Sequence, residues 1–139
     1  MEFIEQYHLI AATLLARVFL GILFLFQGYD AIFNIGLKNV SETFQTSFAN
    51  KKIPNQLINL AVYFTSFTEL IGGVFLITGF CEYFALYALG VNLLIAALGF
   101  SINSAMWDMR FVFPRLLLLL LLLFTPQSWH TCSLDNLFF

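Results

Sequence analysis

Charged residues are scarce in this chain, since six Lys and Arg and eight Asp and Glu make up only 10% of its 139 residues. Soluble domains carry about 25% charged residues, so an ordinary water-soluble domain is excluded. The formal net charge of -2 is too small for a surface that binds nucleic acid. Hydrophobic residues account for 60% of the chain, and its mean hydropathy is +0.88. This composition is typical of an integral membrane protein.

Motifs of the common enzyme classes are also missing. The sequence has no P-loop, no Gly-rich dinucleotide loop, no H-E-x-x-H and no G-x-S-x-G. Its two His and two Cys residues, His8, His130, Cys81 and Cys132, match no known metal-ligand spacing, so we expect no metal. For Cys81 and Cys132 three readings stay open: a disulfide, a redox-active pair, or two unpaired thiols.

Four apolar runs are long enough to cross a bilayer as helices. They cover about 9–33, 57–80, 84–104 and 109–126. A helix satisfies its own backbone hydrogen bonds in lipid. We therefore expect an all-α fold, an antiparallel four-helix membrane bundle formed by residues 1–139 as a single domain. Apolar residues at helical spacing in the first connection, Leu37, Val40, Phe44 and Phe48, predict a short interfacial helix between spans one and two.

Basic residues fall in the loops on one side of this arrangement. The loops after spans one and three hold Lys38, Lys51, Lys52 and Arg110. The two tails and the short connection Cys81–Tyr83 hold no Lys or Arg. By the positive-inside rule, the basic loops are cytoplasmic and both termini lie outside the cytoplasm.

One polar residue lies near the middle of each predicted span. These residues are Arg17, Glu69, Asn92 and Arg115. A charge inside a membrane helix costs about 3 kcal/mol on lenient scales, so it is usually partnered and often functional. At helical rise all four lie about 12–16 Å from the outer surface, which predicts one buried polar layer. Two arginines against one carboxylate would leave that layer net positive.

Two roles for this layer stay open. It could fix the register of the helices, since buried ion pairs can specify geometry. It could instead bind a polar head group, such as a quinone ring or an acid, or relay protons. A second polar group lies nearer the cytoplasmic side and consists of Gln27, Asp30, Asp108 and Arg110. Interfacial capping and solvation account for it, although Asp108 could also reach Arg115.

Several short segments, taken in order, are similar to a known family. They are Arg17–Gly21, Phe26–Gly28, Ile53-Pro54, Glu69–Gly73, Gly79, Arg115 and Ser133–Asp135. With them the chain resembles the DoxX family of small four-span bacterial membrane proteins over nearly its whole length. It departs from that family at Thr125–Cys132, where relatives often carry a Gly-Pro-Gly-like turn.

The resemblance implies a place in the bacterial cytoplasmic (inner) membrane and a role in redox metabolism. Relatives are associated with a terminal quinol oxidase or look like membrane subunits of thiosulfate:quinone oxidoreductases. We expect an accessory, non-catalytic subunit of a respiratory or redox complex, with the lipid bilayer and larger membrane subunits as partners. One alternative is a quinone-linked oxidoreductase that acts on an extracytoplasmic thiol or sulfur compound, with quinone as cofactor. A small transporter is the other, although broken helices in matched halves are missing.

Overall fold

The computed structural model describes residues 2–131 and 133–138, without the side chains of residues 104–109, 136 and 138, and this part of the chain is helical with no strand. The elements are α1 (Glu2–Tyr29), a π-helical turn (Asp30–Asn34), α2 (Leu37–Ser47), α3 (Asn55–Thr78), α4 (Glu82–Phe124), a 3-10 turn (Gln127–Trp129) and α5 (Asp135–Phe138). The helix expected between the first two spans is α2. The other long helices begin or end at residues different from those expected from the sequence.

Three helical stretches of the described chain are long and apolar enough to cross a membrane. They are Glu2–Asn34, Asn55–Thr78 and Glu82–Asn103. The first begins well before the expected residue 9, because the polar N-terminal residues continue the helix. The last two predicted spans, 84–104 and 109–126, are not separate helices, since α4 is helical from Glu82 to Phe124.

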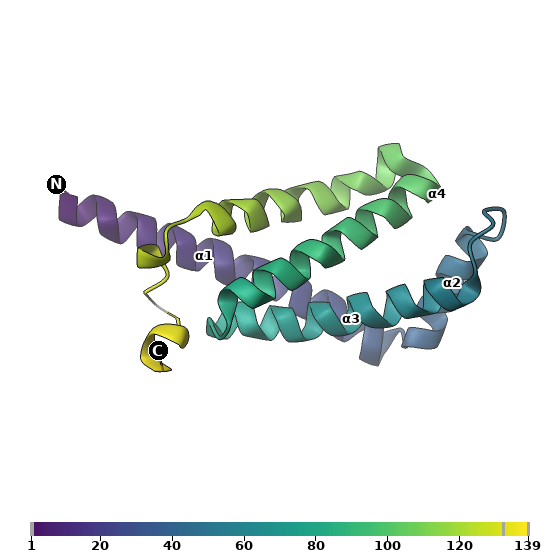
Figure 1. Cartoon of the computed structure of the whole chain (residues 1–139), viewed down its shortest axis with the longest axis horizontal. Helices are drawn as coiled ribbons and strands as arrows, with labels where there is room; N and C mark the ends of the chain where they lie inside the picture. Colours follow the sequence, from purple (N-terminus) through teal and green to yellow (C-terminus); the bar gives the residue numbers. More distant parts are fainter. Residues whose placement is uncertain (1, 132, 139) are drawn as a thin grey trace.

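Figure 1 shows that α4 turns back on itself, so that its second half runs beside its first. The contact between the halves is close, because a Cβ atom added at Gly90 would lie 3.7 Å from Leu119 Cδ2. Fully buried side chains from α1, α3 and both halves of α4 form the core, including Leu20, Leu76, Leu89 and Leu122. The core thus joins residues far apart in the sequence.

The axes of α1 and α3 approach each other at glycines. A Cβ atom added at Gly73 would lie 2.6 Å from Leu25 N, and one at Gly28 would lie 2.5 Å from Leu70 N. Both distances are shorter than real Cβ contacts allow. Small residues let membrane helices pack backbone against backbone, and here they bring Gln27 of α1 up to α3.

The short helix α2 packs against the first turns of α3. Phe48, Ile58 and Val62 form a small buried cluster, with Val40 and Phe44 of α2 packed against it. Asn59 of α3 accepts hydrogen bonds from two polar side chains of α2, Ser41 and Gln45. The packing holds α2 at the end of the bundle away from the α3–α4 connection (Figure 1).

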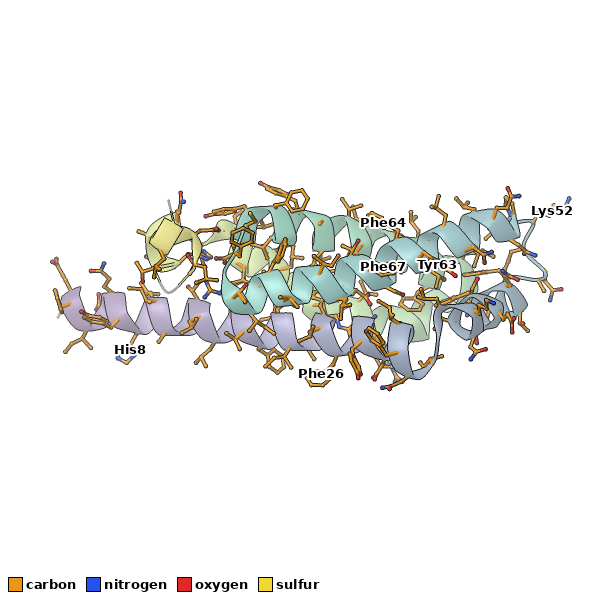
Figure 2. All side chains as sticks on the ribbon, turned by 90° about the horizontal axis from the view of Figure 1, so that it is seen from below. His8, Phe26, Lys52, Tyr63, Phe64 and Phe67 are labelled. Atoms are coloured by element: carbon orange, nitrogen blue, oxygen red, sulfur yellow. The ribbon has the colours of Figure 1, made fainter. Side chains whose placement is uncertain are left out.

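Large apolar side chains cover the outside of the helices. Phe26 is 61% exposed, and Phe64 and Phe67 are 44% and 45% exposed. Figure 2 shows Phe26, Tyr63, Phe64 and Phe67 on the outer surface of α1 and α3. An aqueous surface with so much apolar area would aggregate, whereas acyl chains can solvate it.

Candidate functional site

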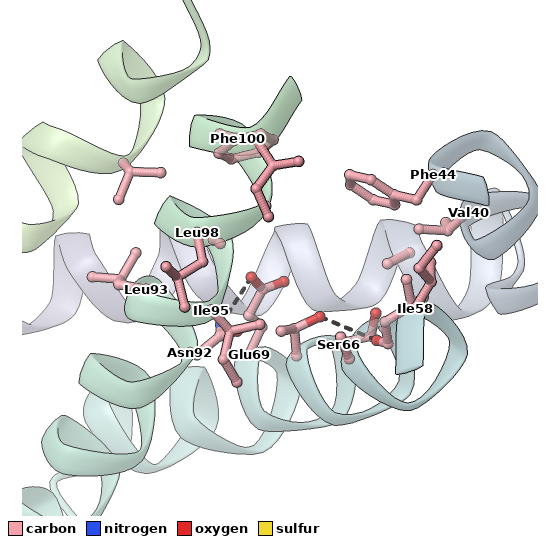
Figure 3. Close-up of a pocket in the computed structure, with 18 of the residues that line it drawn as sticks. Val40, Phe44, Ile58, Ser66, Glu69, Asn92, Leu93, Ile95, Leu98 and Phe100 are labelled. Atoms are coloured by element: carbon pink, nitrogen blue, oxygen red, sulfur yellow. Dashed lines mark hydrogen bonds between the residues drawn. The ribbon is translucent and has the colours of Figure 1, made fainter. Parts of the chain in front are cut away.

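A cavity of about 570 Å³ lies between α2, α3 and the two halves of α4. Most of its wall is apolar, with Val40 and Phe44 from α2, Leu93 and Phe100 from α4, and Ile58 from α3. The polar residues of the wall are Gln27, Thr65, Ser66, Glu69, Asn92 and Arg115. Figure 3 shows Glu69 and Asn92 toward one end of this pocket and the α2 side chains toward the other.

Glu69 is the centre of the polar end. Its Oε1 atom accepts a hydrogen bond from Gln27 Nε2 at 3.0 Å and another from Asn92 Nδ2 at 3.0 Å. Gln27 Oε1 in turn accepts a hydrogen bond from Arg115 Nη1. Gln27 therefore links the carboxylate of α3 to the guanidinium group of α4, and the three helices meet here.

The orientation of both amides follows from the charges at their ends. A carboxylate only accepts and a guanidinium only donates, so the Asn92 and Gln27 nitrogens must face Glu69 and the Gln27 oxygen must face Arg115. This leaves Asn92 Oδ1 on the other side of a side chain that is 0% exposed. That oxygen has no hydrogen-bond donor among the described residues.

A second polar cluster is built around Glu82, the first residue of α4. Arg17 Nη1 lies 3.0 Å from Glu82 Oε2, and the two side chains are only 2% and 3% exposed. His130 Nδ1 lies 2.5 Å from Glu82 Oε1 and is buried as well. One carboxylate of the α3–α4 connection thus contacts two basic side chains, one from α1 and one from the C-terminal segment.

The His130 ring lies between Thr125 and Glu82. The Thr125 hydroxyl donates its single proton to Leu122 O at 2.7 Å, so Thr125 Oγ1 accepts from His130 Nε2 at 2.7 Å. The Nδ1 atom on the other side of the ring lies 2.5 Å from Glu82 Oε1. His130 therefore connects Thr125 at the end of α4 with Glu82 at its start.

The C-terminal segment docks on the α3–α4 connection. The Asp135 carboxylate accepts hydrogen bonds from the backbone N–H groups of Cys81 at 2.9 Å and Glu82 at 3.1 Å. Asp135 N donates to Gly79 O at 3.2 Å. Gly79 has a φ of +69° and Ser133 lies against it, so close that an added Cβ would be 2.7 Å from Ser133 Cα. A glycine is needed at this position for both reasons.

The predicted polar layer is divided between the two clusters. Glu69, Asn92 and Arg115 lie together, but Arg17 lies with Glu82 and close to Gly79, about 15 Å along the helix from Glu69. The expectation of a net positive layer is wrong for the pocket, because the charged side chains in its wall are one Glu and one Arg. Sequence reasoning missed Glu82 because this residue was counted as part of a loop. The signal that could have revealed it is its position within reach of Arg17, a buried arginine that needs a partner.

The predicted cytoplasmic-side group is not a cluster in the structure. Gln27 bonds to Glu69 and Arg115 as described above. Asp30 accepts a hydrogen bond from Asn34 at 2.5 Å, and the exposed Arg110 lies over the Phe111 ring. No hydrogen bond or ion pair among the described side chains joins Gln27, Asp30 and Arg110. The side chain of Asp108 lies outside the described residues.

Cys81 is exposed at the start of α4 and has a φ of +46°. Cys132 lies outside the described residues, so the predicted pairing of these two cysteines stays a prediction.

Three comparisons with known proteins were made, and one of them found a match. The model of the DoxX family matches residues 12–102, which include most of α1, all of α2 and α3, and the first half of α4. Comparison with curated proteins and with solved structures found no match. The matched region contains Arg17, Glu69, Glu82 and Asn92, and thus members of both polar clusters.

Proposed function

This chain belongs to the DoxX family, and we propose that it is an integral membrane component of a bacterial redox assembly that binds the head group of a quinone in its pocket. The observation that carries the proposal is the cavity itself, an apolar space of about 570 Å³ with one polar end. Ligand sites of this kind are commonly about 300–1,000 Å³, largely apolar, with a few convergent polar groups.

The residues of the pocket fit a quinone. The ring carbonyls need hydrogen-bond donors, and the half-buried Arg115 has N–H groups beyond the one bonded to Gln27. Ser66 contributes a hydroxyl to the same wall. Val40, Phe44 and Leu93 give the isoprenoid tail an apolar surface. A quinone bound there would act as an acceptor of electrons and protons from the rest of the assembly.

The charge of the pocket also suits a neutral head group. Glu69 and Arg115 carry opposite charges and are joined through Gln27. Neither sign is in excess among the charged side chains of the wall, so a carboxylate or phosphate ligand would gain little. A quinone has no formal charge to compensate and matches this balance.

The arrangement in the membrane is part of the proposal. We take the second half of α4, within residues 109–126, as a fourth crossing that completes a single four-span bundle over residues 1–139. The protein lies in the bacterial cytoplasmic membrane with both termini outside. Its exposed apolar faces, which carry Phe26, Phe64 and Phe67, contact lipid and the larger subunits of the assembly.

Quinone-linked oxidation of a thiol or sulfur compound by this chain alone has less support. The exposed Cys81 lies past the C-terminal end of α3, whereas Glu69 is about 15 Å back along that helix. Thiol chemistry at Cys81 would therefore be distant from the ring in the pocket. This separation favours an accessory role, in which partner subunits carry out the redox steps.

The test is to purify the tagged full chain in mild detergent, extract it with organic solvent and quantify quinone per protein. We expect nearly one quinone per chain. Ala96→Phe fills the pocket wall and should remove the quinone, whereas Leu94→Phe on the 61% exposed face of the same helix should retain it. Equal quinone in wild type and Ala96→Phe would contradict the pocket assignment. Absence of oxidase or dehydrogenase subunits from the same eluate would contradict the accessory role.

A further inference from the structure

We propose that the pocket selects a head group that donates hydrogen bonds, so that the dihydroxy form of a quinone binds more tightly than the dione. This inference rests on the proposed function, namely that a quinone-type amphiphile occupies the pocket. The inference adds which redox form of the quinone the protein retains. It is argued from the polar atoms at the buried end of the pocket.

The first of these atoms is Asn92 Oδ1. The amide nitrogen of Asn92 is committed to Glu69 at 3.0 Å, which fixes the oxygen on the opposite side. The side chain is 0% exposed and forms part of the pocket wall. Its oxygen has no donor among the described residues. A buried carbonyl oxygen is costly without a donor, and Asn92 belongs to the wall of the adjacent cavity.

The second atom is Glu69 Oε2. Gln27 and Asn92 both donate to Oε1, and no described residue donates a hydrogen bond to Oε2. An ionised carboxylate oxygen only accepts. Glu69 therefore presents a second acceptor beside Asn92, on a side chain that is 7% exposed.

The hydroxyl of Thr65 adds to this acceptor character. It donates its proton to Val62 O at 3.1 Å, so only its lone pairs remain for a ligand. The donors in the wall are the half-buried Arg115, which is joined to Glu69 through Gln27, and the Ser66 hydroxyl, which can also accept. The acceptors that lack a donor are thus concentrated at Glu69 and Asn92.

These acceptors distinguish the two redox forms. A hydroxyl of the reduced ring can donate to Asn92 Oδ1 or Glu69 Oε2, and its oxygen keeps lone pairs for a donor of the wall. A carbonyl of the oxidised ring at the same position would place lone pairs against the lone pairs of a carboxylate. One hydrogen bond to a buried acceptor gained or lost changes affinity by about tenfold.

Three probes of nearly equal size test the inference on the purified full chain in detergent. They are decylubiquinone, decylubiquinol kept anaerobic, and the dimethyl ether of decylubiquinol, which has the shape of the quinol but no donor. Binding is measured by calorimetric titration. We expect the quinol to bind about tenfold more tightly than the other two.

Asn92→Leu removes the acceptor at nearly constant volume and should reduce the preference for quinol over quinone to about twofold. The control Leu94→Ala, on the lipid-facing side, should leave this preference unchanged. If Asn92→Leu does not fold, the three probes on the wild-type protein decide the question. Equal affinity for quinol and quinone would overturn the inference and leave the proposed function standing. Binding of none of the probes would overturn the proposed function itself.

Discussion

Arg17 of α1 and Glu82 at the start of α4 form an ion pair of 3.0 Å in which both side chains are almost completely buried. His130 contacts the other oxygen of the same carboxylate, and the Asp135 carboxylate binds the backbone N–H of Glu82. Arg17 of α1, Glu82 of the α3–α4 connection, and His130 and Asp135 of the C-terminal segment therefore meet in one cluster. The pair fixes α1, the α3–α4 connection and the C-terminal segment in one arrangement.

Removing one partner of this pair should destabilise the protein strongly. Loss of one member of a buried ion pair costs about 3–5 kcal/mol because the other charge stays buried. Glu82→Leu should lower thermal stability in detergent more than Arg17→Leu, since it deprives both Arg17 and His130 of their carboxylate. The double variant should be more stable than Glu82→Leu alone. Additive losses of thermal stability in the double variant would show that the two groups do not stabilise each other. The control is Glu42→Leu on the exposed side of α2, which should leave thermal stability unchanged.

Backbone contact at Gly73 gives a second prediction. Gly73→Ala would place a methyl group 2.6 Å from Leu25 N, so α1 and α3 must separate. Forcing extra volume into a packed interface costs about 1–3 kcal/mol, and we expect a corresponding loss of thermal stability. Gly90→Ala is the matched control, because its methyl group would meet Leu119 at an ordinary 3.7 Å. This substitution also raises the helix propensity of the position. Equal effects of the two substitutions would refute the close approach.

The helices themselves were predictable because their signal is local. The four predicted apolar runs fall on three helices, α1, α3 and α4. The spacing of Leu37, Val40 and Phe44 predicted α2 correctly. The ends were less predictable. Nothing in the hydropathy distinguishes a run that stops from one that continues, so the two runs of α4 were counted as separate helices.

The polar contacts were only partly predictable. Depth along a helix was sufficient to group Glu69 with Asn92 and Arg115. Depth failed for Arg17, because its partner Glu82 lies in a three-residue connection that belongs to no apolar run. It also failed for Gln27, because the contact of Gln27 with Glu69 depends on how closely α1 and α3 approach at Gly28. The return of Asp135 to the start of α4 is a long-range contact, and no periodicity in the sequence encodes it.

Docking of the C-terminal segment is tested by hydrogen exchange. Asp135→Ala removes the acceptor for the N–H groups of Cys81 and Glu82, so both amides should exchange faster by about tenfold, as expected when one protective bond of about 1.4 kcal/mol is lost. The readout is deuterium uptake of a peptide that covers residues 79–84. Peptides from α2 should show no change, and uptake that stays at the wild-type rate would mean that Asp135 does not protect this connection.

Orientation in the membrane decides on which side the pocket lies. Because Lys38 lies in the first turn of α2 and Lys51 and Lys52 follow this helix, the positive-inside rule places α2 in the cytoplasm and Cys81 outside. A membrane-impermeant maleimide should therefore label Cys81 in intact spheroplasts of a Cys132→Ser strain. Lys51→Cys, with both native cysteines replaced by Ser, should be labelled only after permeabilisation.

Since the α2 side chains Val40 and Phe44 line the pocket, this result would place the quinone site in the cytoplasmic half and the Arg17–Glu82 pair in the outer half. The reverse labelling pattern would exchange the two halves, and partner subunits that supply or remove quinol would have to be sought on the opposite face.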